Sequence, residues 1–447
     1  MRLGPRLVVA GTHSGVGKTT VATGLMAALR RRGMRVAPAK VGPDFIDPGY
    51  HALACGRPGR NLDAWMCGPD LIPALAGRAA KHADLLVVEG VMGMFDGAAD
   101  GTPSSTADVA ELLDAPVLLV VDCSAQAGSV AALVHGFSTF EPKLNVAGVV
   151  LNRLASAGHE RMARDALAGM RAPVPVVGAL HRDDRLAWRD RHLGLVPVAE
   201  RPTEVGAALD VLAESMRTAC DLDTIVAIAR SAKAIEVGEP PAPRRVGRTR
   251  VAIASGKAFT FAYPDNAEAL AAAGAEIVAF DPLVDQRLPE GTAAIVVGGG
   301  FPEVMAEQLS ANTPLLADVR RQIAAGLIVW AECGGLLWLC RSLDGHRQAG
   351  VLEADAVMTD RLTLGYRTAQ CRMATPLGEA GTQLRGHEFH YSTVTPAGDA
   401  LDVRGLFGGG LAGFATPSLL ASYVHTHLAG QPQLAEAFVR RAAQRHT

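Results

Sequence analysis

The 447-residue chain lacks long apolar runs and extended basic stretches. No segment approaches the ~18 consecutive apolar residues that a membrane span needs. The apolar segment Leu7–Ala10 is too short for the core of a signal peptide. The net charge is −2 and the longest basic run is Arg30–Arg32, which does not predict binding to nucleic acid. We therefore expect a cytoplasmic protein, with neither nucleic acid nor membrane as a partner.

Disulfide and zinc patterns are missing as well. The seven cysteines are an odd number at irregular spacings, and no Cys-x-x-Cys occurs. This predicts free thiols in a reducing compartment, with no disulfide framework and no zinc site. The sequence also contains no repeat of fixed period and no low-complexity tract.

An α/β pattern fills most of the chain. Strands that are apolar on both faces and alternate with helices predict a doubly wound parallel sheet. Residues 203–234 are expected to form two closing helices, and the proline-rich segment 238–249 is expected to be a linker. The sequence thus predicts one α/β domain over 1–237 and a second over 250–447, more β-rich near 349–426. The expected strands are 7–11, 36–41, 84–89, 117–122, 146–151, 174–179, 250–254, 276–280, 293–297 and 327–331.

A glycine-rich loop between the first strand and the first helix predicts a phosphate site. Free N–H groups at a helix start cradle phosphate, Lys18 can reach the terminal phosphates, and the Thr19 hydroxyl can hold Mg²⁺. The pattern G-x-x-x-x-G-K-[ST] expects glycine where Thr12 stands, a variant tolerated by some ATPases that act on carboxylates. The predicted nucleotide-binding residues of this loop are Thr12, Gly15, Val16, Gly17, Lys18, Thr19 and Thr20.

Carboxylates and a lysine follow two further strands, at the sheet edge where ligands bind. With Thr19, we predict Asp44 and Glu89 as Mg²⁺ ligands. Solvated turns and a polar strand end are the alternatives for these acids. Contacts to the substrate or its intermediate are predicted for Lys40, Asp44, Asp47 and Asp96.

Asn152 ends the fifth strand, at Leu151–Arg153. Its amide could bond the edge of adenine, because it offers both a donor and an acceptor. A turn-capping role is an equal alternative.

The second half contains the elements of a glutaminase. Cys333 stands at a strand-to-helix turn, where the helix N-terminus favours a thiolate. His425 supplies a base, and the N–H groups of Gly299, Gly300 and Gly334 could form an oxyanion hole. These motifs resemble the flavodoxin-like class I glutamine amidotransferase domain. That family usually has glutamate two residues after the histidine, where this chain has His427. What orients His425 is therefore open.

The whole chain resembles the cobyrinic and hydrogenobyrinic acid a,c-diamide synthase family of cobalamin biosynthesis. The motifs that carry the resemblance are Lys40–His51, Glu89–Gly97 and Gly386–Ser392. The first half also resembles dethiobiotin synthetase. The third motif, which contains His387, His390 and Tyr391, could contact the macrocycle or an interface, or could be a structural turn.

The resemblance implies a P-loop amidoligase domain fused to a glutaminase. Ammonia freed from glutamine by Cys333 and His425 would displace phosphate from an acyl phosphate, made with ATP and Mg²⁺ on cobyrinate or hydrogenobyrinate. Alternatives are amidation of another tetrapyrrole such as nickel-sirohydrochlorin, a P-loop switch ATPase of the partitioning type, and a regulatory glutamine sensor. The oligomeric state is open, with a homodimer among the alternatives.

Overall fold

The computed structural model describes residues 1–183, 190–191, 194–195, 202–406 and 408–445. The chain divides into two compact units, Met1–Pro240 (unit 1) and Pro241–Thr447 (unit 2). Residues 238–248, in the segment expected to be a linker, form neither helix nor strand. In the described part of the chain, no helix is both long and apolar enough to cross a membrane.

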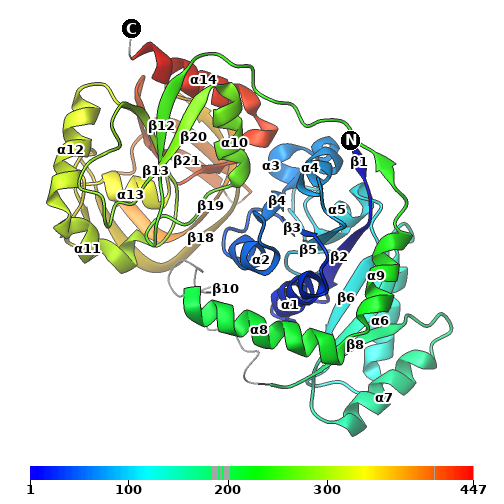
Figure 1. The fold of residues 1–447 in the computed structure, drawn as a ribbon. Coiled ribbons are helices and arrows are strands. Elements are labelled where there is room, and N and C mark those ends of the chain that lie inside the picture. The colour runs from blue at the N-terminus through cyan, green and yellow to red at the C-terminus, as the bar shows by residue number, and fades with distance from the viewer. Residues whose placement is uncertain (184–189, 192–193, 196–201, 407, 446–447) are drawn as a thin grey trace. The chain divides into compact units, whose positions relative to one another are not determined.

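Unit 1 is built on a seven-stranded parallel sheet in the order β4-β3-β5-β2-β6-β7-β8 (Figure 1). The central strands are buried on both faces, which explains their continuous apolar sequence. The strand bounds are β2 (Arg6–Gly11), β3 (Val36–Val41), β4 (Arg60–Leu62), β5 (Leu85–Glu89), β6 (Val117–Asp122), β7 (Val146–Leu154) and β8 (Val176–His181). Two short antiparallel pairs add β1 (Arg2–Leu3) with β11 (Ile235–Glu236), and β9 (Asp190–Arg191) with β10 (Gly194–Leu195).

Helices cover this sheet, and α8 packs directly against α1 (Figure 1). The approach is close at Gly24, where an added Cβ would lie 2.8 Å from Cγ of Met216. The helix bounds are α1 (Lys18–Arg31), α2 (Asp47–Cys55), α3 (Ala64–Cys67), α4 (Ile72–Ala79), α5 (Thr106–Leu112), α6 (Ser129–Thr139), α7 (Ala157–Ala168), α8 (Pro202–Ala219) and α9 (Leu222–Ser231).

Unit 2 contains a six-stranded sheet in the order β13-β12-β14-β15-β23-β22. Its neighbouring strands are parallel except for the β22–β23 pair. The strands are β12 (Thr249–Ala254), β13 (Ala275–Phe280), β14 (Thr292–Val297), β15 (Ile328–Glu332), β22 (Phe414–Thr416) and β23 (Leu419–Ser422). The helices are α10 (Pro264–Ala273), α11 (Ala306–Ala311), α12 (Thr313–Ala324), α13 (Gly334–Leu339) and α14 (Pro432–Gln444).

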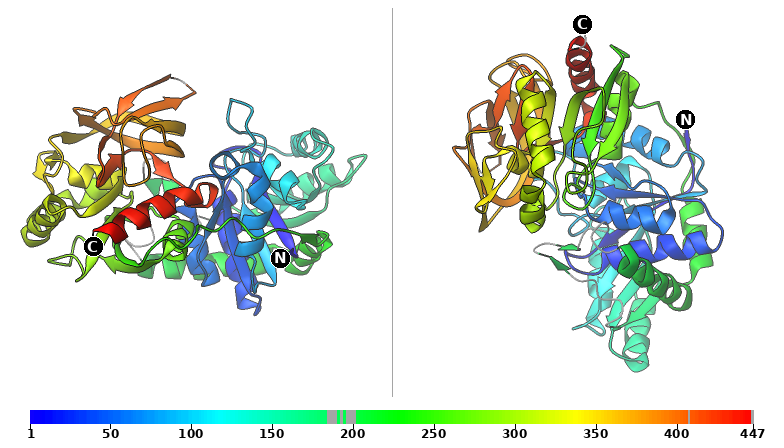
Figure 2. Two further views of the ribbon diagram at one scale, coloured as in Figure 1. Left: turned by 90° about the horizontal axis from the view of Figure 1, so that it is seen from above. Right: turned by 60° about the vertical axis from the view of Figure 1, so that its left-hand side comes forward.

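A second sheet accounts for the β-rich sequence near 349–426, and its orange and brown strands form a separate layer within unit 2 (Figure 2). Its long central pair, β18 and β19, is antiparallel and carries the Gly386–Ser392 motif on β19. The strands are β16 (Ser342–Leu343), β17 (His346–Arg347), β18 (Asp355–Cys371), β19 (Gln383–Thr395), β20 (Leu401–Gly405), β21 (Gly408–Ala412) and β24 (His425–Thr426).

The predicted α/β class and doubly wound sheet are confirmed. The boundaries of two predicted strands shift most: the predicted strand 146–151 extends to Leu154, and the predicted strand 174–179 begins at Val176. Pro175 precedes it and has no N–H to donate to a neighbouring strand. The Gly386–Ser392 motif, for which a structural turn is one of the alternatives, lies in strand β19 and pairs with β18 on both sides of a register shift.

Candidate functional site

The glycine-rich loop of unit 1 has the backbone of a phosphate cradle. Helix α1 begins at Lys18, and the preceding Gly15 and Gly17 have left-handed φ angles of 79° and 97°. A Cβ at Gly17 would collide with the Asn152 amide, so both the backbone conformation and the space require glycine. Thr12 replaces a glycine that the P-loop pattern expects, but Gly15 and Gly17 are both present.

Lys18 lies along this loop. Its Nζ donates to the backbone carbonyls of His13, at 3.2 Å, and Met92. Burial, together with the nearby Lys40 ammonium, lowers the Lys18 pKa to about 8. Thr12 bonds the ring of His13 at 3.0 Å, and Thr20 lies half-buried in the first turn of α1.

Asn152 braces the same loop. Its Nδ2 donates to the carbonyl of Val16 at 2.9 Å, and its Oδ1 accepts the N–H of Arg153 at 2.9 Å. The side chain therefore fixes the phosphate loop to the end of β7. Contact with adenine stays a prediction.

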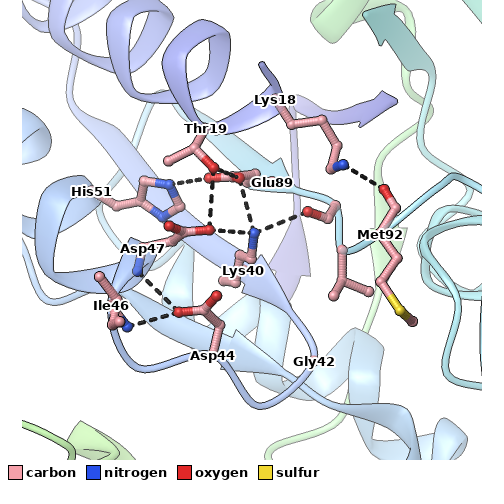
Figure 3. A network of polar contacts seen from close by, with 12 residues as sticks. Lys18, Thr19, Lys40, Gly42, Asp44, Ile46, Asp47, His51, Glu89 and Met92 are labelled. Atoms are coloured by element: carbon pink, nitrogen blue, oxygen red, sulfur yellow. Dashed lines mark hydrogen bonds and ion pairs between the residues drawn. The ribbon is translucent and has the colours of Figure 1, made fainter. Parts of the chain in front are cut away.

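A buried cluster of acids and a lysine lies beside Thr19 (Figure 3). The Thr19 hydroxyl lies 2.6 Å from Oε1 of Glu89 and 3.3 Å from Oδ2 of Asp47. Lys40 Nζ lies 2.6 Å from Asp47 and 2.9 Å from Glu89. Lys40 and Glu89 are register partners on the parallel strands β3 and β5, so their side chains reach the same sheet edge.

The charges in this cluster depend on one another. Burial opposes the charged form of Lys40, but the carboxylates of Asp47 and Glu89 raise its pKa above the usual range. Burial likewise opposes ionised Glu89, but Lys40 and His51 hold its pKa below the usual range. The cluster therefore keeps an ionised carboxylate in a buried position.

His51 is a member of the cluster that the sequence analysis did not assign to the site. Its Nε2 lies 2.6 Å from Oε2 of Glu89, and both side chains are fully buried. His51 stands four residues after Asp47 on α2, and residues at this spacing share a helix face. The spacing of four residues from Asp47 was the feature of the sequence that could have indicated His51 as a member of the site.

The assignment of Asp44 as a metal ligand stays a prediction, and the structure gives this carboxylate a further role in a turn. Its Oδ1 accepts the N–H groups of Ile46 and Asp47 at 2.7 and 3.0 Å, so it caps the turn before α2. Asp47, predicted to contact substrate, is the carboxylate that lies beside Thr19. Asp96 is exposed and accepts the N–H of Gly93 at 2.8 Å, which fixes its own loop.

Three oxygen donors thus converge in unit 1, from Thr19, Asp47 and Glu89. Hydroxyl and carboxylate oxygens are the donors that Mg²⁺ prefers, and one or two protein carboxylates are typical when phosphates supply further ligands. The donor set therefore fits Mg²⁺ bound with a nucleotide.

Cys333 occupies a strained elbow in unit 2. It lies between the end of β15 and the start of α13, with φ 48° and ψ −101°, a conformation uncommon for a non-glycine residue. Gly334 and Gly300 approach closely, since a Cβ on Gly334 would lie 3.1 Å from the Gly300 nitrogen. The Gly299–Gly300 loop and the elbow therefore adjoin, as an oxyanion hole requires.

His425 reaches this elbow from β24. A Cβ on Gly299 would lie 2.5 Å from Cε1 of His425, which places the imidazole against the glycine loop. Burial would lower the His425 pKa, but the nearby Cys333 thiol and Glu332 carboxylate raise it to about 10. The thiol and the base are thus together.

Two neighbours of His425 were missed by sequence reasoning. Glu332 Oε2 lies 3.6 Å from Nδ1 of His425. His387 stacks on the His425 ring with centroids 5.0 Å apart, and Tyr263 bonds the Nε2 of His387 at 3.0 Å. Burial and the nearby His425 lower the His387 pKa well below its usual value, which keeps the stacked ring neutral.

Two family models match the chain, one in each half. The CobQ/CobB/MinD/ParA nucleotide binding domain matches residues 7–195, and the CobB/CobQ-like glutamine amidotransferase domain matches residues 250–433.

Curated relatives match nearly the whole chain. The hydrogenobyrinate a,c-diamide synthase of Streptomyces coelicolor is 49% identical, over 98% of this chain and 97% of the relative. The hydrogenobyrinate a,c-diamide synthase of Thermobifida fusca is 46% identical, over 97% of this chain and 96% of the relative. The cobyrinate a,c-diamide synthase of Syntrophotalea carbinolica is 43% identical, over 97% and 98%. This chain therefore belongs to the family of cobyrinate and hydrogenobyrinate a,c-diamide synthases.

Proposed function

We propose that the chain uses glutamine and ATP to convert the a and c carboxylates of hydrogenobyrinate into amides, in cobalamin biosynthesis. The observation that carries the proposal is the presence of two candidate sites in one chain. Cys333 and His425 are the candidate nucleophile and base, and Lys40, Asp47 and Glu89 lie beside Thr19 at the end of the phosphate loop.

In unit 2, the Cys333 thiolate attacks the carboxamide carbon of glutamine. The developing oxyanion accepts hydrogen bonds from the Gly299–Gly300 loop and Gly334, and protonated His425 supplies the proton with which ammonia leaves. Water then attacks the thioester, and glutamate is released. The elbow suits this step because it places the thiol beside the loop and the base.

In unit 1, a corrin carboxylate attacks the terminal phosphate of ATP to give an acyl phosphate, and ammonia displaces phosphate from it. Activation is needed because a carboxylate resists attack by an amine. Lys18, which lies along the loop, would contact the terminal phosphates, and Lys40 would balance negative charge within the site. Mg²⁺ held by Thr19, Asp47 and Glu89 would neutralise charge on the phosphates and help to orient them.

The metal-free corrin is proposed as substrate because relatives at 46–49% identity carry the name hydrogenobyrinate a,c-diamide synthase, whereas relatives named cobyrinate a,c-diamide synthase are 39–43% identical. Cobyrinate and nickel-sirohydrochlorin are the competing substrates. A non-synthetic partitioning ATPase would need neither corrin nor a glutaminase, and the geometry around Cys333 argues against it. Cytoplasmic location and a homodimer stay predictions.

The test incubates the protein separately with hydrogenobyrinate, cobyrinate and nickel-sirohydrochlorin, each with ATP, Mg²⁺ and glutamine, and analyses products by mass spectrometry. Each amidation replaces –OH by –NH₂ and lowers the mass by about one unit. Two successive losses with hydrogenobyrinate are expected, at a higher kcat/KM than with the other two. No mass change with any corrinoid, or a preference for nickel-sirohydrochlorin, would overturn the proposal.

A further inference from the structure

Glu332 immediately precedes Cys333 and lies against the candidate base. One carboxylate oxygen, Oε2, lies 3.6 Å from Nδ1 of His425. The other, Oε1, accepts the backbone N–H of Thr426 at 2.9 Å. The carboxylate is therefore fixed by the residue next to His425 and turned toward one nitrogen of its ring.

The sheet explains why these residues meet although they are distant in sequence. Glu332 ends β15 and is the register partner of Ser422, which ends the parallel strand β23. The N–H of Cys333 continues this pairing by donating to the Ser422 carbonyl at 2.8 Å. Because parallel strands end at one edge, the segment after β23 brings His425 to the residues that follow β15.

Because Glu332 is buried, its negative charge needs compensation from nearby groups. Glu332 and His425 are 5% and 1% exposed. A buried carboxylate needs a cation or hydrogen-bond donors to offset its lost hydration. Here the Thr426 N–H and the His425 ring are positioned to supply them, so an imidazolium at His425 would be favoured by Glu332.

His427 stands where class I glutamine amidotransferases usually have a glutamate. It does not face Nδ1 of His425 as Glu332 does. His427 instead accepts the N–H of Ala429 through Nδ1 at 3.3 Å, and its ring lies against Tyr263 with centroids 4.5 Å apart. Its direction is therefore set by the turn that follows β24.

Other titratable and charged groups surround His425. Cys333 lies near it at the elbow, and His387 stacks on its ring from β19. His390 and Arg367 lie farther along the same sheet, and the carboxylate of Glu388 is held by Arg367 at 2.8 Å. Among these described groups, Glu332 is the carboxylate that faces Nδ1.

We propose that Glu332 is the positioning residue for His425. It keeps a proton on Nδ1, which leaves the Nε2 lone pair for the Cys333 thiol. The Sγ proton then moves to Nε2, and the Glu332 carboxylate stabilises the resulting imidazolium. As the thioester forms and the carbon–nitrogen bond of the glutamine carboxamide breaks, that proton leaves with ammonia. The inference rests on the proposed glutaminase function.

The test compares Glu332→Gln with the wild-type enzyme over a range of pH. We expect kcat/KM for glutamine to fall about 100-fold, while ammonia-dependent amidation is retained. The alkaline limb of the kcat/KM profile should move to lower pH, because the imidazolium loses its stabilising charge. Glu332→Asp keeps the charge and should retain the alkaline limb while lowering kcat/KM. Glu436→Gln, which neutralises a carboxylate held by Arg244, is the matched control and should leave both readouts unchanged.

A measurement on the wild-type protein makes the test independent of how the variants fold. ¹⁵N NMR of labelled histidine, assigned with a His425→Gln sample, should show a proton on Nδ1 of His425. A neutral His425 protonated on Nε2, or a Glu332→Gln variant with wild-type kcat/KM and an unshifted alkaline limb, would overturn the inference. Failure of the proposed glutaminase function would give a different result. In that case Cys333→Ala would retain glutamine-dependent activity.

Discussion

The Thr19 hydroxyl lies 2.6 Å from Oε1 of Glu89, although 70 residues separate them in the chain. This contact joins the start of the first helix to the end of a neighbouring strand, and Asp47 adds a second carboxylate at 3.3 Å from the hydroxyl. The arrangement places two carboxylates beside the candidate phosphate site, where charge decides both metal binding and stability.

The contrast between Asp47 and Asp44 gives a direct test of metal binding. Asp47→Asn should increase the Mg²⁺ concentration for half-maximal ATP hydrolysis about tenfold, because it removes a charged donor. Asp44→Asn is the matched control and should leave the Mg²⁺ requirement near wild type, because Asp44 caps a turn. The measurement is a Mg²⁺ titration at saturating ATP. A larger effect at Asp44 than at Asp47 would favour Asp44 as the ligand.

Lys40 should be important for the stability of unit 1. Lys40→Met leaves Asp47 and Glu89 close together without their shared cation, and losing one partner of a buried ion pair costs about 3–5 kcal/mol. Hydrogen exchange of peptides from β3 and β5 would measure the loss. Lys143→Met removes an exposed pair with Glu111 and should change stability by less than about 1 kcal/mol. Equal effects in the two variants would contradict the prediction.

Cys333→Ala should separate the two half-reactions. We expect no detectable amidation with glutamine but near wild-type amidation with ammonium chloride, because the synthetase site is untouched. Product masses with each nitrogen source provide the measurement. Cys220→Ala removes a half-buried thiol from unit 1 and should support both reactions. Glutamine-dependent product from Cys333→Ala would refute the nucleophile assignment.

Gly299 should tolerate no side chain, because a Cβ there would lie 2.5 Å from Cε1 of His425. Gly299→Ala is expected to lower kcat/KM for glutamine by at least about tenfold by displacing the base, with ammonia-dependent amidation unaffected. Gly410→Ala is a suitable control, since its Cβ would have no neighbour within 4 Å. Wild-type glutaminase kinetics in Gly299→Ala would argue against the observed packing.

The stability of unit 2 should depend on pH in opposite directions on the two sides of about pH 6.5. Burial lowers the His390 pKa to about 4, so stability is lost as pH falls from about 6.5 toward 4. The His425 pKa is raised to about 10, so its contribution is present below about pH 6.5 and is lost as pH rises toward 10.

Hydrogen exchange of unit 2 peptides at several pH values would test this dependence. In His390→Gln, the stability that unit 2 loses between about pH 6.5 and pH 4 should be smaller by roughly 2–3 kcal/mol. The loss of stability above about pH 6.5 should be unchanged. His159→Gln, a variant in unit 1, serves as the control. If His390→Gln lost as much stability between about pH 6.5 and pH 4 as the wild type, His390 would not be the cause of the acid dependence.

Much of the fold was predictable from local sequence. Buried parallel strands read as continuous apolar runs, and the predicted strand 117–122 matches β6 at both ends. The phosphate loop and the cysteine elbow were also predictable, because a helix start fixes which backbone groups are free for a ligand. In both cases the signal lies within about a dozen adjacent residues.

The sequence by itself determined the two α/β units, the phosphate loop and the cysteine elbow, because each depends on local backbone conformation or on residue type. The resemblance to a known family supplied His425 as the partner of the cysteine. Only the tertiary structure decided that Asp47 rather than Asp44 lies beside Thr19, that His51 supports Glu89, and that Glu332 faces Nδ1 of His425. The physical reason is that strand register and the direction of a side chain at a sheet edge are set by packing across the whole sheet. Neighbours in the sequence do not encode them.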